Sequence, residues 1–127
     1  MIQNLVSKPG RYWHARTLSF TYAFAGIVLF FRSEQNARIH LAATAGAVAV
    51  SCIYGVSLTE AVLLVMVTAL VWAAEMFNTC IEKIMDFISM ERHPQIKFIK
   101  DVAAGAVLVT AIAALITGLI IFIPKIF

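Results

Sequence analysis

Charged residues are scarce in this 127-residue chain: they make up 13% of it, against roughly a quarter in ordinary soluble domains. Hydrophobic residues make up 61%, and the mean hydropathy is +0.89. This composition excludes a disordered chain and argues against a water-soluble globular domain. The length suits one domain, without room for a separate catalytic module beside a membrane anchor.

Cysteine is also scarce, with two residues, Cys52 and Cys80, that each lie inside an apolar run. They match no metal-binding spacing and no disulfide framework, so we interpret both as buried, inert thiols. A signal peptide is not expected, because the first apolar stretch runs into Arg32 without a small-residue cleavage site. The net charge of +3 does not indicate a nucleic-acid partner, since the basic residues flank apolar runs rather than form one patch.

Three apolar stretches predict membrane-spanning helices, each of which needs about 20 residues to cross a bilayer. They include residues 39–56, 61–74 and 102–123, and the helical pattern of the second continues past its apolar part. Pro124 is expected to end the third helix. A fourth stretch, residues 18–31, reaches only about 21 Å as a helix, so we interpret it as a helix that lies in the membrane interface or dips into it.

The positions of the basic residues predict the topology of the chain. Nine of the ten lysines and arginines precede the first span or lie between the second and the third, and only Lys125 falls on the opposite side. Cytoplasmic segments of membrane proteins carry an excess of basic residues. The N-terminus and the connection between the second and third spans are therefore expected in the cytoplasm.

Local signals predict where the helices begin and end. Residues 57–60 read Ser-Leu-Thr-Glu, a capping-box spacing that predicts a helix start, and no breaker follows through Phe87. Pro94 suits the first turn of the next helix, so the turn of an antiparallel hairpin falls near residues 89–93. The predicted fold is all-α, a helical bundle in one domain over residues 1–127. Its surface helix and three spans cover about 17–31, 39–56, 58–88 (with a cytoplasmic extension) and 94–123.

One face of the second span carries a row of polar residues. Glu75, Asn78, Glu82 and Asp86 fall within an arc of roughly 80° on a helix. A helix that leaves the membrane turns polar, which accounts for Asp86 and Glu82. Glu75 directly follows an unbroken apolar run, and a carboxylate at that depth is costly and indicates a functional site.

Two further groups of charges accompany this face. If the hairpin turn centres near residue 91, Lys100 and Asp101 lie level with Glu82, and a lysine can bridge the 8 to 10 Å between packed helices. Glu34 and Arg38, just before the first span, form an i, i+4 pair. That pair is consistent either with a solvated helix turn or with a part in the site.

These residue types together are typical of phosphoryl transfer at a membrane surface. Clustered carboxylate and amide oxygens suit Mg²⁺, and a nearby lysine can hold a phosphate. A deeper carboxylate can act as general base toward a hydroxyl, while catalysis is mostly positioning and charge neutralisation. The chain has neither a G-x-x-x-x-G-K-[ST] phosphate loop nor the H-R-D and D-F-G signatures. A soluble kinase fold is therefore excluded.

The polar row has a pattern that resembles a known family. Residues 75–86 read E-x-x-N-x-x-x-E-x-x-x-D, and residues 100–107 read KDVAAGAV. This pattern resembles the prokaryotic diacylglycerol kinases, which include the undecaprenol kinases of Gram-positive bacteria. The similarity covers about residues 16–123, and upstream it includes residues 19–27 (SFTYAFAGI) and 34–40 (EQNARIH). It implies a homotrimer in the bacterial plasma membrane, with an N-terminal surface helix and active sites shared between protomers.

The resemblance also implies roles for individual residues. Glu75 corresponds to the general base, and Glu34 and Glu82 to the carboxylates that hold Mg²⁺. Lys100 and Asp101 correspond to contacts with the phosphates of ATP. Further nucleotide contacts match Tyr22, Glu91, Arg92 and His93, and Arg16 with a spacing shifted by one residue. Other polar positions of the site match Asn78, Asp86 and Arg38.

The acceptor is expected to be a membrane lipid alcohol, undecaprenol or diacylglycerol. Residues 93–101 and 38–40 are more similar to the undecaprenol kinase branch than to the Gram-negative diacylglycerol kinase branch. Two alternatives from other classes remain open at this point. A proton or cation conduit would explain carboxylates inside the membrane. It would also be expected to carry polar residues through the outer half of the membrane, whereas the third span has only Thr110 and Thr117. A structural assembly subunit would show no dependence on ATP.

Overall fold

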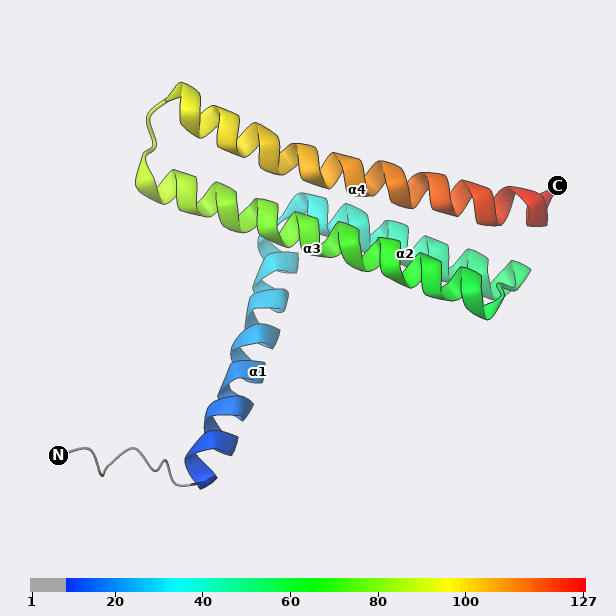
Figure 1. Cartoon of the computed structure of the whole chain (residues 1–127), viewed down its shortest axis with the longest axis horizontal. Helices are drawn as coiled ribbons and strands as arrows, with labels where there is room; N and C mark the ends of the chain where they lie inside the picture. Colours follow the sequence, from blue (N-terminus) through cyan, green and yellow to red (C-terminus); the bar gives the residue numbers. More distant parts are fainter. Residues whose placement is uncertain (1–8) are drawn as a thin grey trace. The chain divides into compact units, whose positions relative to one another are not determined.

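The computed structural model of the protein describes residues 9–127, with side chains from residue 16 onward, so Lys8 and the side chain of Arg11 lie outside the described part. In this part the chain forms four helices and no strand: α1 (Pro9–Ser33), α2 (Gln35–Tyr54), α3 (Leu58–Ile88) and α4 (Pro94–Ile126). Helix α1 is a unit by itself, and α2, α3 and α4 form a second unit in which they lie side by side (Figure 1).

The prediction of an all-α membrane protein with three spans and an N-terminal helix is confirmed. Among the described residues, α2, α3 and α4 are long and apolar enough to cross a membrane. Helix α1 has 25 residues and begins eight residues earlier than the predicted surface helix. Its first residue is Pro9, which suits the first turn of a helix because that turn has no use for the missing N–H.

The ends of α2 and α3 follow from a few residues. Gly55 ends α2 with a φ of 67°, in the left-handed region that favours glycine. Ser57 then caps α3: its Oγ accepts from the Glu60 N–H at 3.3 Å, and the Glu60 carboxylate accepts from the Ser57 N–H at 2.7 Å. The predicted capping box is therefore confirmed.

The hairpin between α3 and α4 is also confirmed, with its turn at residues 89–93. His93 caps α4, since its Nδ1 accepts from the Gln95 N–H at 3.2 Å, and Pro94 occupies the first helical turn. The expectation that Pro124 ends α4 is wrong. Proline removes one backbone N–H donor, but so near the end of the helix this loss disrupts few backbone hydrogen bonds. The Phe127 N–H still donates to the Ile123 carbonyl at 3.2 Å.

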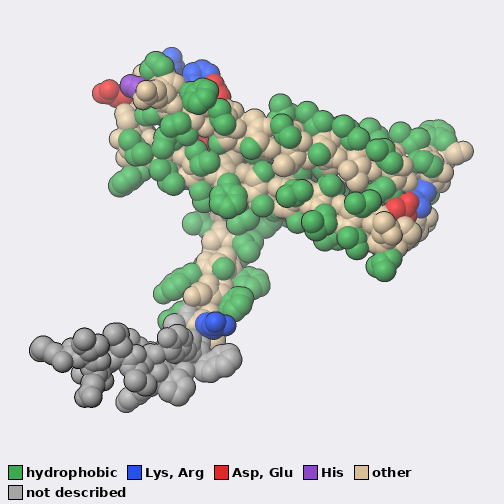
Figure 2. Space-filling model, in the orientation of Figure 1, with side chains coloured by type: hydrophobic (Ala, Val, Ile, Leu, Met, Phe, Trp, Pro, Cys, Tyr) green, Lys and Arg blue, Asp and Glu red, His purple; other side chains and the backbone are tan. Residues whose placement is uncertain are grey.

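The interior of the α2–α4 unit is small. In α3 and α4 the buried hydrophobic residues are Val71, Ala103 and Ile121, whereas many large apolar side chains are exposed. Figure 2 shows hydrophobic side chains over the middle of this unit and charged ones at its two ends. A lipid-exposed bundle has this pattern, because hydrocarbon is as apolar as the side chains that face it.

The two cysteines correct one prediction. Cys52 and Cys80 are free, as expected, but both are exposed on the helix surface rather than buried. An apolar run in a membrane helix does not imply a protein interior, since three helices enclose little volume and most of their surface remains outside it.

Candidate active site

The centre of the candidate site is a pair of buried polar side chains on α3. Glu75 is 3% exposed and Asn78 is 7% exposed. The Oε2 atom of Glu75 and the Oδ1 atom of Asn78 have no hydrogen-bond partner. Because an unpaired polar group is costly in a low-dielectric interior, two oxygen atoms in this state favour a cation or a hydroxyl donor as their natural partner.

Glu82 extends this pair by one turn. The Asn78 amide donates through Nδ2 to Oε1 of Glu82 at 3.1 Å. The i, i+4 spacing of these two residues predicts that they meet on one helix face, and the structure agrees. The Asn78 amide therefore donates to a carboxylate while its Oδ1 atom remains without a partner. As a result, this face of α3 presents oxygen atoms on successive helical turns.

Helix α4 contributes a lysine at the next level. The Nζ atom of Lys100 forms a salt bridge with Oδ1 of Asp86 at 2.5 Å. Side chains lean toward the N-terminus of their helix. Since α4 begins at the hairpin turn, Lys100 leans toward the turn and meets Asp86, which is closer to the turn than Glu82. Asp101 pairs instead with Lys97 on α4 itself.

Glu34 reaches α3 from the start of α2. It occupies the N-cap position, with φ −105° and ψ 126°, and its carboxylate forms a salt bridge with Nζ of Lys83 at 3.4 Å. Lys83 was not predicted as a site residue; its position next to Glu82 was the available signal. Glu34 therefore lies beside the part of α3 that carries the candidate metal carboxylate.

The other predicted site residues are more scattered. Glu91, Arg92 and His93 are exposed in the turn between α3 and α4, and Arg38 is exposed on α2. The remaining two, Arg16 and Tyr22, are exposed on α1, which forms its own unit. Within the described residues of one chain, no group of three His, Cys, Asp or Glu side chains is arranged to hold a metal ion.

Comparison with known proteins identifies the family. The family model of prokaryotic diacylglycerol kinase matches residues 21–122. The chain belongs to this family. It is 36% identical to the undecaprenol kinase of Bacillus subtilis over 107 residues, which is 84% of this chain and 87% of that one.

Other relatives are named diacylglycerol kinases. The diacylglycerol kinase of Synechocystis is 33% identical over 108 residues, 84% of this chain and 62% of that one. The diacylglycerol kinase of Escherichia coli K12 is 32% identical over 100 residues, 79% of this chain and 82% of that one. The predicted enzyme class, a kinase that acts on a lipid alcohol, is confirmed by the family match, which supports it over a conduit or an assembly subunit.

The matched segment of this lipid kinase contains nearly all of the candidate site. It includes Tyr22 at its start and runs through Asp101, so the polar face of α3 and the lysine of α4 both fall inside it. Arg16 lies before it. With three apolar helices and this family, the kinase is a bacterial membrane protein.

Proposed function

We propose that this kinase transfers the γ-phosphate of ATP to the hydroxyl of a membrane lipid alcohol, with Glu75 as the general base. The observation that carries the proposal is the buried Glu75 carboxylate, whose Oε2 has no partner and which follows directly on the apolar part of α3. A carboxylate in this position can accept the proton of a hydroxyl that a lipid presents from within the bilayer. Enzymes that phosphorylate an alcohol need such an acceptor near the attacking oxygen.

The donor atoms on α3 fit Mg²⁺ in chemical type. The unpartnered Oδ1 of Asn78 and the carboxylate oxygens of Glu82 are hard ligands, and Mg²⁺ takes one or two carboxylates and leaves the rest to water and phosphate. Fewer than three carboxylates per chain is therefore compatible with it. Glu82 and Glu34 would hold the ion, which neutralises charge on the phosphates when bound.

The remaining residues act on the phosphates and the nucleotide. Lys100 binds a phosphate oxygen in exchange for its contact with Asp86, and both groups are accessible, at 32% and 49% side-chain exposure. Asp101 lies on the adjacent position of α4. The resemblance assigns further nucleotide contacts to the turn residues Glu91, Arg92 and His93. It assigns others to Tyr22 and Arg16 of α1. Arg38 stands as a further polar residue of the site.

Undecaprenol is the acceptor that we propose first, with diacylglycerol as the alternative. The relative named undecaprenol kinase has 36% identity and matches over 87% of its own length, and residues 93–101 are more similar to that branch. Relatives named diacylglycerol kinase, at 32–33% identity, support the alternative.

The assembly and its orientation complete the proposal. The resemblance to the family supports a homotrimer with sites shared between protomers. A cytoplasmic N-terminus agrees with the charge distribution: Lys125 pairs with Glu60 at the α2–α3 end, whereas Lys83, Lys97 and Lys100 lie near the α3–α4 turn.

A direct assay tests the function. Purified protein in detergent or lipid receives labelled ATP and Mg²⁺ with diacylglycerol and undecaprenol side by side, and phosphorylated lipid is resolved by thin-layer chromatography. We expect label in undecaprenyl phosphate, and none when Mg²⁺ is removed with a chelator. Label in phosphatidic acid alone would show that diacylglycerol, and not undecaprenol, is the acceptor. No label in either lipid would contradict the kinase function.

A further inference from the structure

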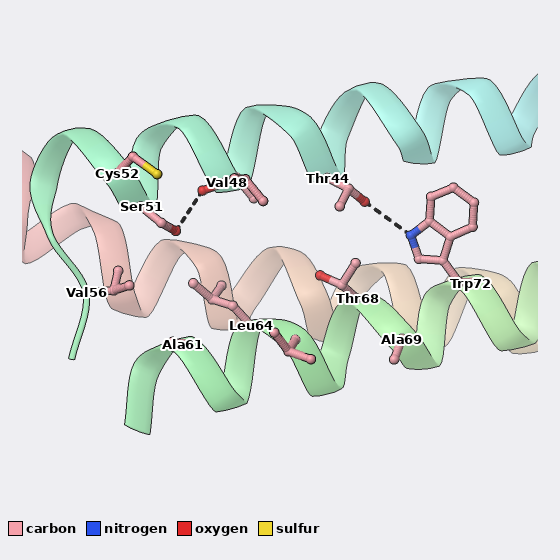
Figure 3. A pocket seen from close by; sticks show the side chains of 12 residues that line it. Thr44, Val48, Ser51, Cys52, Val56, Ala61, Leu64, Thr68, Ala69 and Trp72 are labelled. Carbon is pink, nitrogen blue, oxygen red and sulfur yellow. Dashed lines mark hydrogen bonds between the residues drawn. The ribbon is translucent and has the colours of Figure 1, made fainter. Parts of the chain in front are cut away.

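A hydrogen bond joins α2 to α3 one turn away from Glu75. The indole Nε1 of Trp72 donates to Oγ1 of Thr44 at 3.2 Å (Figure 3). The Thr44 hydroxyl donates in turn to the His40 carbonyl at 2.7 Å. The hydroxyl therefore uses its one proton within α2 and accepts from α3. The hydroxyls of Ser51, Thr110 and Thr117 instead donate to carbonyls of their own helices.

The bond crosses a sparsely packed part of the helix interface. Thr44 and Trp72 line a cavity of about 420 Å³ between α2 and α3, seen in Figure 3. Both residues also line a second cavity, of about 490 Å³, among α2, α3 and α4. Along its whole length α3 contacts α2 much less than it contacts α4. In hydrocarbon, moreover, an indole N–H that loses its acceptor has no water to replace it.

Glu75 lies between two contacts that tie α3 to α2. Trp72 precedes it by three residues, about 4.5 Å along the helix axis, and Lys83 follows it by eight and pairs with Glu34. Glu34 and Thr44 are ten positions apart in the chain, and Trp72 and Lys83 are eleven apart, so the two separations along a helix are similar, about 15 to 17 Å. The two contacts therefore fit one antiparallel register and act together on the α3 segment that carries Glu75.

We propose that Thr44 and Trp72 are positioning residues that hold Glu75 at the depth and rotation where it meets the lipid hydroxyl. This inference rests on the proposed function of Glu75 as general base. Neither residue touches the reacting atoms. Their bond prevents α3 from sliding or turning against α2, and general-base catalysis depends on the separation of the base from the hydroxyl, because small misplacements cost large factors in rate.

Three substitutions test the pair. Thr44→Val removes the hydroxyl at nearly constant shape, Trp72→Phe removes the N–H and keeps an aromatic ring, and Thr44→Ser is the conservative control that restores the acceptor. Lipid phosphorylation is measured on the folded fraction recovered by size exclusion. We expect kcat to fall about tenfold or more in the first two variants, with KM for ATP within about twofold of wild type, and wild-type kcat in Thr44→Ser.

The double variant separates positioning from general loss of packing. If the two side chains act through one bond, Thr44→Val with Trp72→Phe has a kcat no lower than the worse single variant. Wild-type kcat in either single variant, additive losses in the double variant, or a loss in Thr44→Ser equal to that in Thr44→Val would overturn the inference while leaving the kinase function intact. A wild-type protein that phosphorylates no lipid would instead overturn the proposed function, and this inference with it.

Discussion

At the scale of single residues, the contrast between Glu75 and Glu60 is informative. Both are carboxylates on α3, but Glu60 accepts from the Ser57 N–H and pairs with Lys125 at 3.2 Å. Glu75 is buried with one oxygen unpartnered. Glu60 thus stabilises the start of the helix. The Oε2 atom of Glu75 has no comparable stabilising contact. This difference is the physical reason for assigning the chemistry to Glu75.

The first prediction concerns that residue. Glu75→Gln removes the proton acceptor and keeps the volume, so we expect an intact fold and a fall in kcat of about 10² to 10⁴-fold. Lipid phosphorylation and size-exclusion behaviour are the measurements. Near-normal kcat in this variant would show that the base is assigned wrongly.

Glu60→Gln is the matched control on the same helix. Glutamine can still serve in the capping box, and the lost salt bridge with Lys125 is a solvent-accessible pair that contributes little to stability. We expect wild-type kcat and KM from this control.

At the scale of helices, two salt bridges join α3 and α4 near opposite ends of the hairpin. Asp86 with Lys100 lies near the turn, and Glu60 with Lys125 lies near the far end. Both are accessible pairs, so neither is expected to contribute much to stability. Removing one lysine should affect activity more than removing the other only if that lysine also binds a ligand, as we propose for Lys100 and a phosphate of ATP.

The second prediction compares these two lysines. Lys100→Met removes a charge-assisted hydrogen bond to phosphate, a contact that contributes about 1.5 to 3 kcal/mol, so KM for ATP should rise by about tenfold to a hundredfold. Lys125→Met removes an equivalent salt bridge at the other end and should leave KM for ATP unchanged. Equal effects of the two substitutions would indicate that Lys100 acts only in the structure.

At the scale of the whole molecule, the surface of α2, α3 and α4 indicates how the protein sits in a membrane. Charged side chains gather at the two ends of this unit, and exposed hydrophobic side chains cover the span between them (Figure 2). The basic residues near the α3–α4 turn outnumber the single lysine near the α2–α3 turn. By the positive-inside rule, we expect the α3–α4 turn to face the cytoplasm.

The third prediction tests this orientation. In a background where Cys52 and Cys80 are replaced by alanine, Leu58→Cys and Met90→Cys place single thiols at the two turns, where the native side chains are 83% and 90% exposed. A membrane-impermeant maleimide should label Leu58→Cys in intact cells and Met90→Cys only after the membrane is opened. The reverse result would place the N-terminus outside the cytoplasm.

Much of the fold followed from local patterns in the sequence. Three apolar runs, the Ser57–Glu60 capping box and Pro94 sufficed to predict the membrane helices and the hairpin, because helices in lipid satisfy their own backbone hydrogen bonds. The polar row from Glu75 through Glu82 was predictable for the same reason, since residues three, four and seven apart share a helix face. The resemblance to the kinase family rested on that row together with residues 100–107, and the family match over residues 21–122 then established membership.

Contacts between helices were decided by the tertiary structure alone. The pairing of Lys100 with Asp86, of Glu34 with Lys83 and of Trp72 with Thr44 depends on the register and rotation of neighbouring helices. Spacing along one helix carries no information about these two quantities, because they result from how side chains of separate segments lean and pack. The exposure of both cysteines and the continuation of α4 through Pro124 have the same origin: each depends on what surrounds the residue in space rather than on its neighbours in the chain.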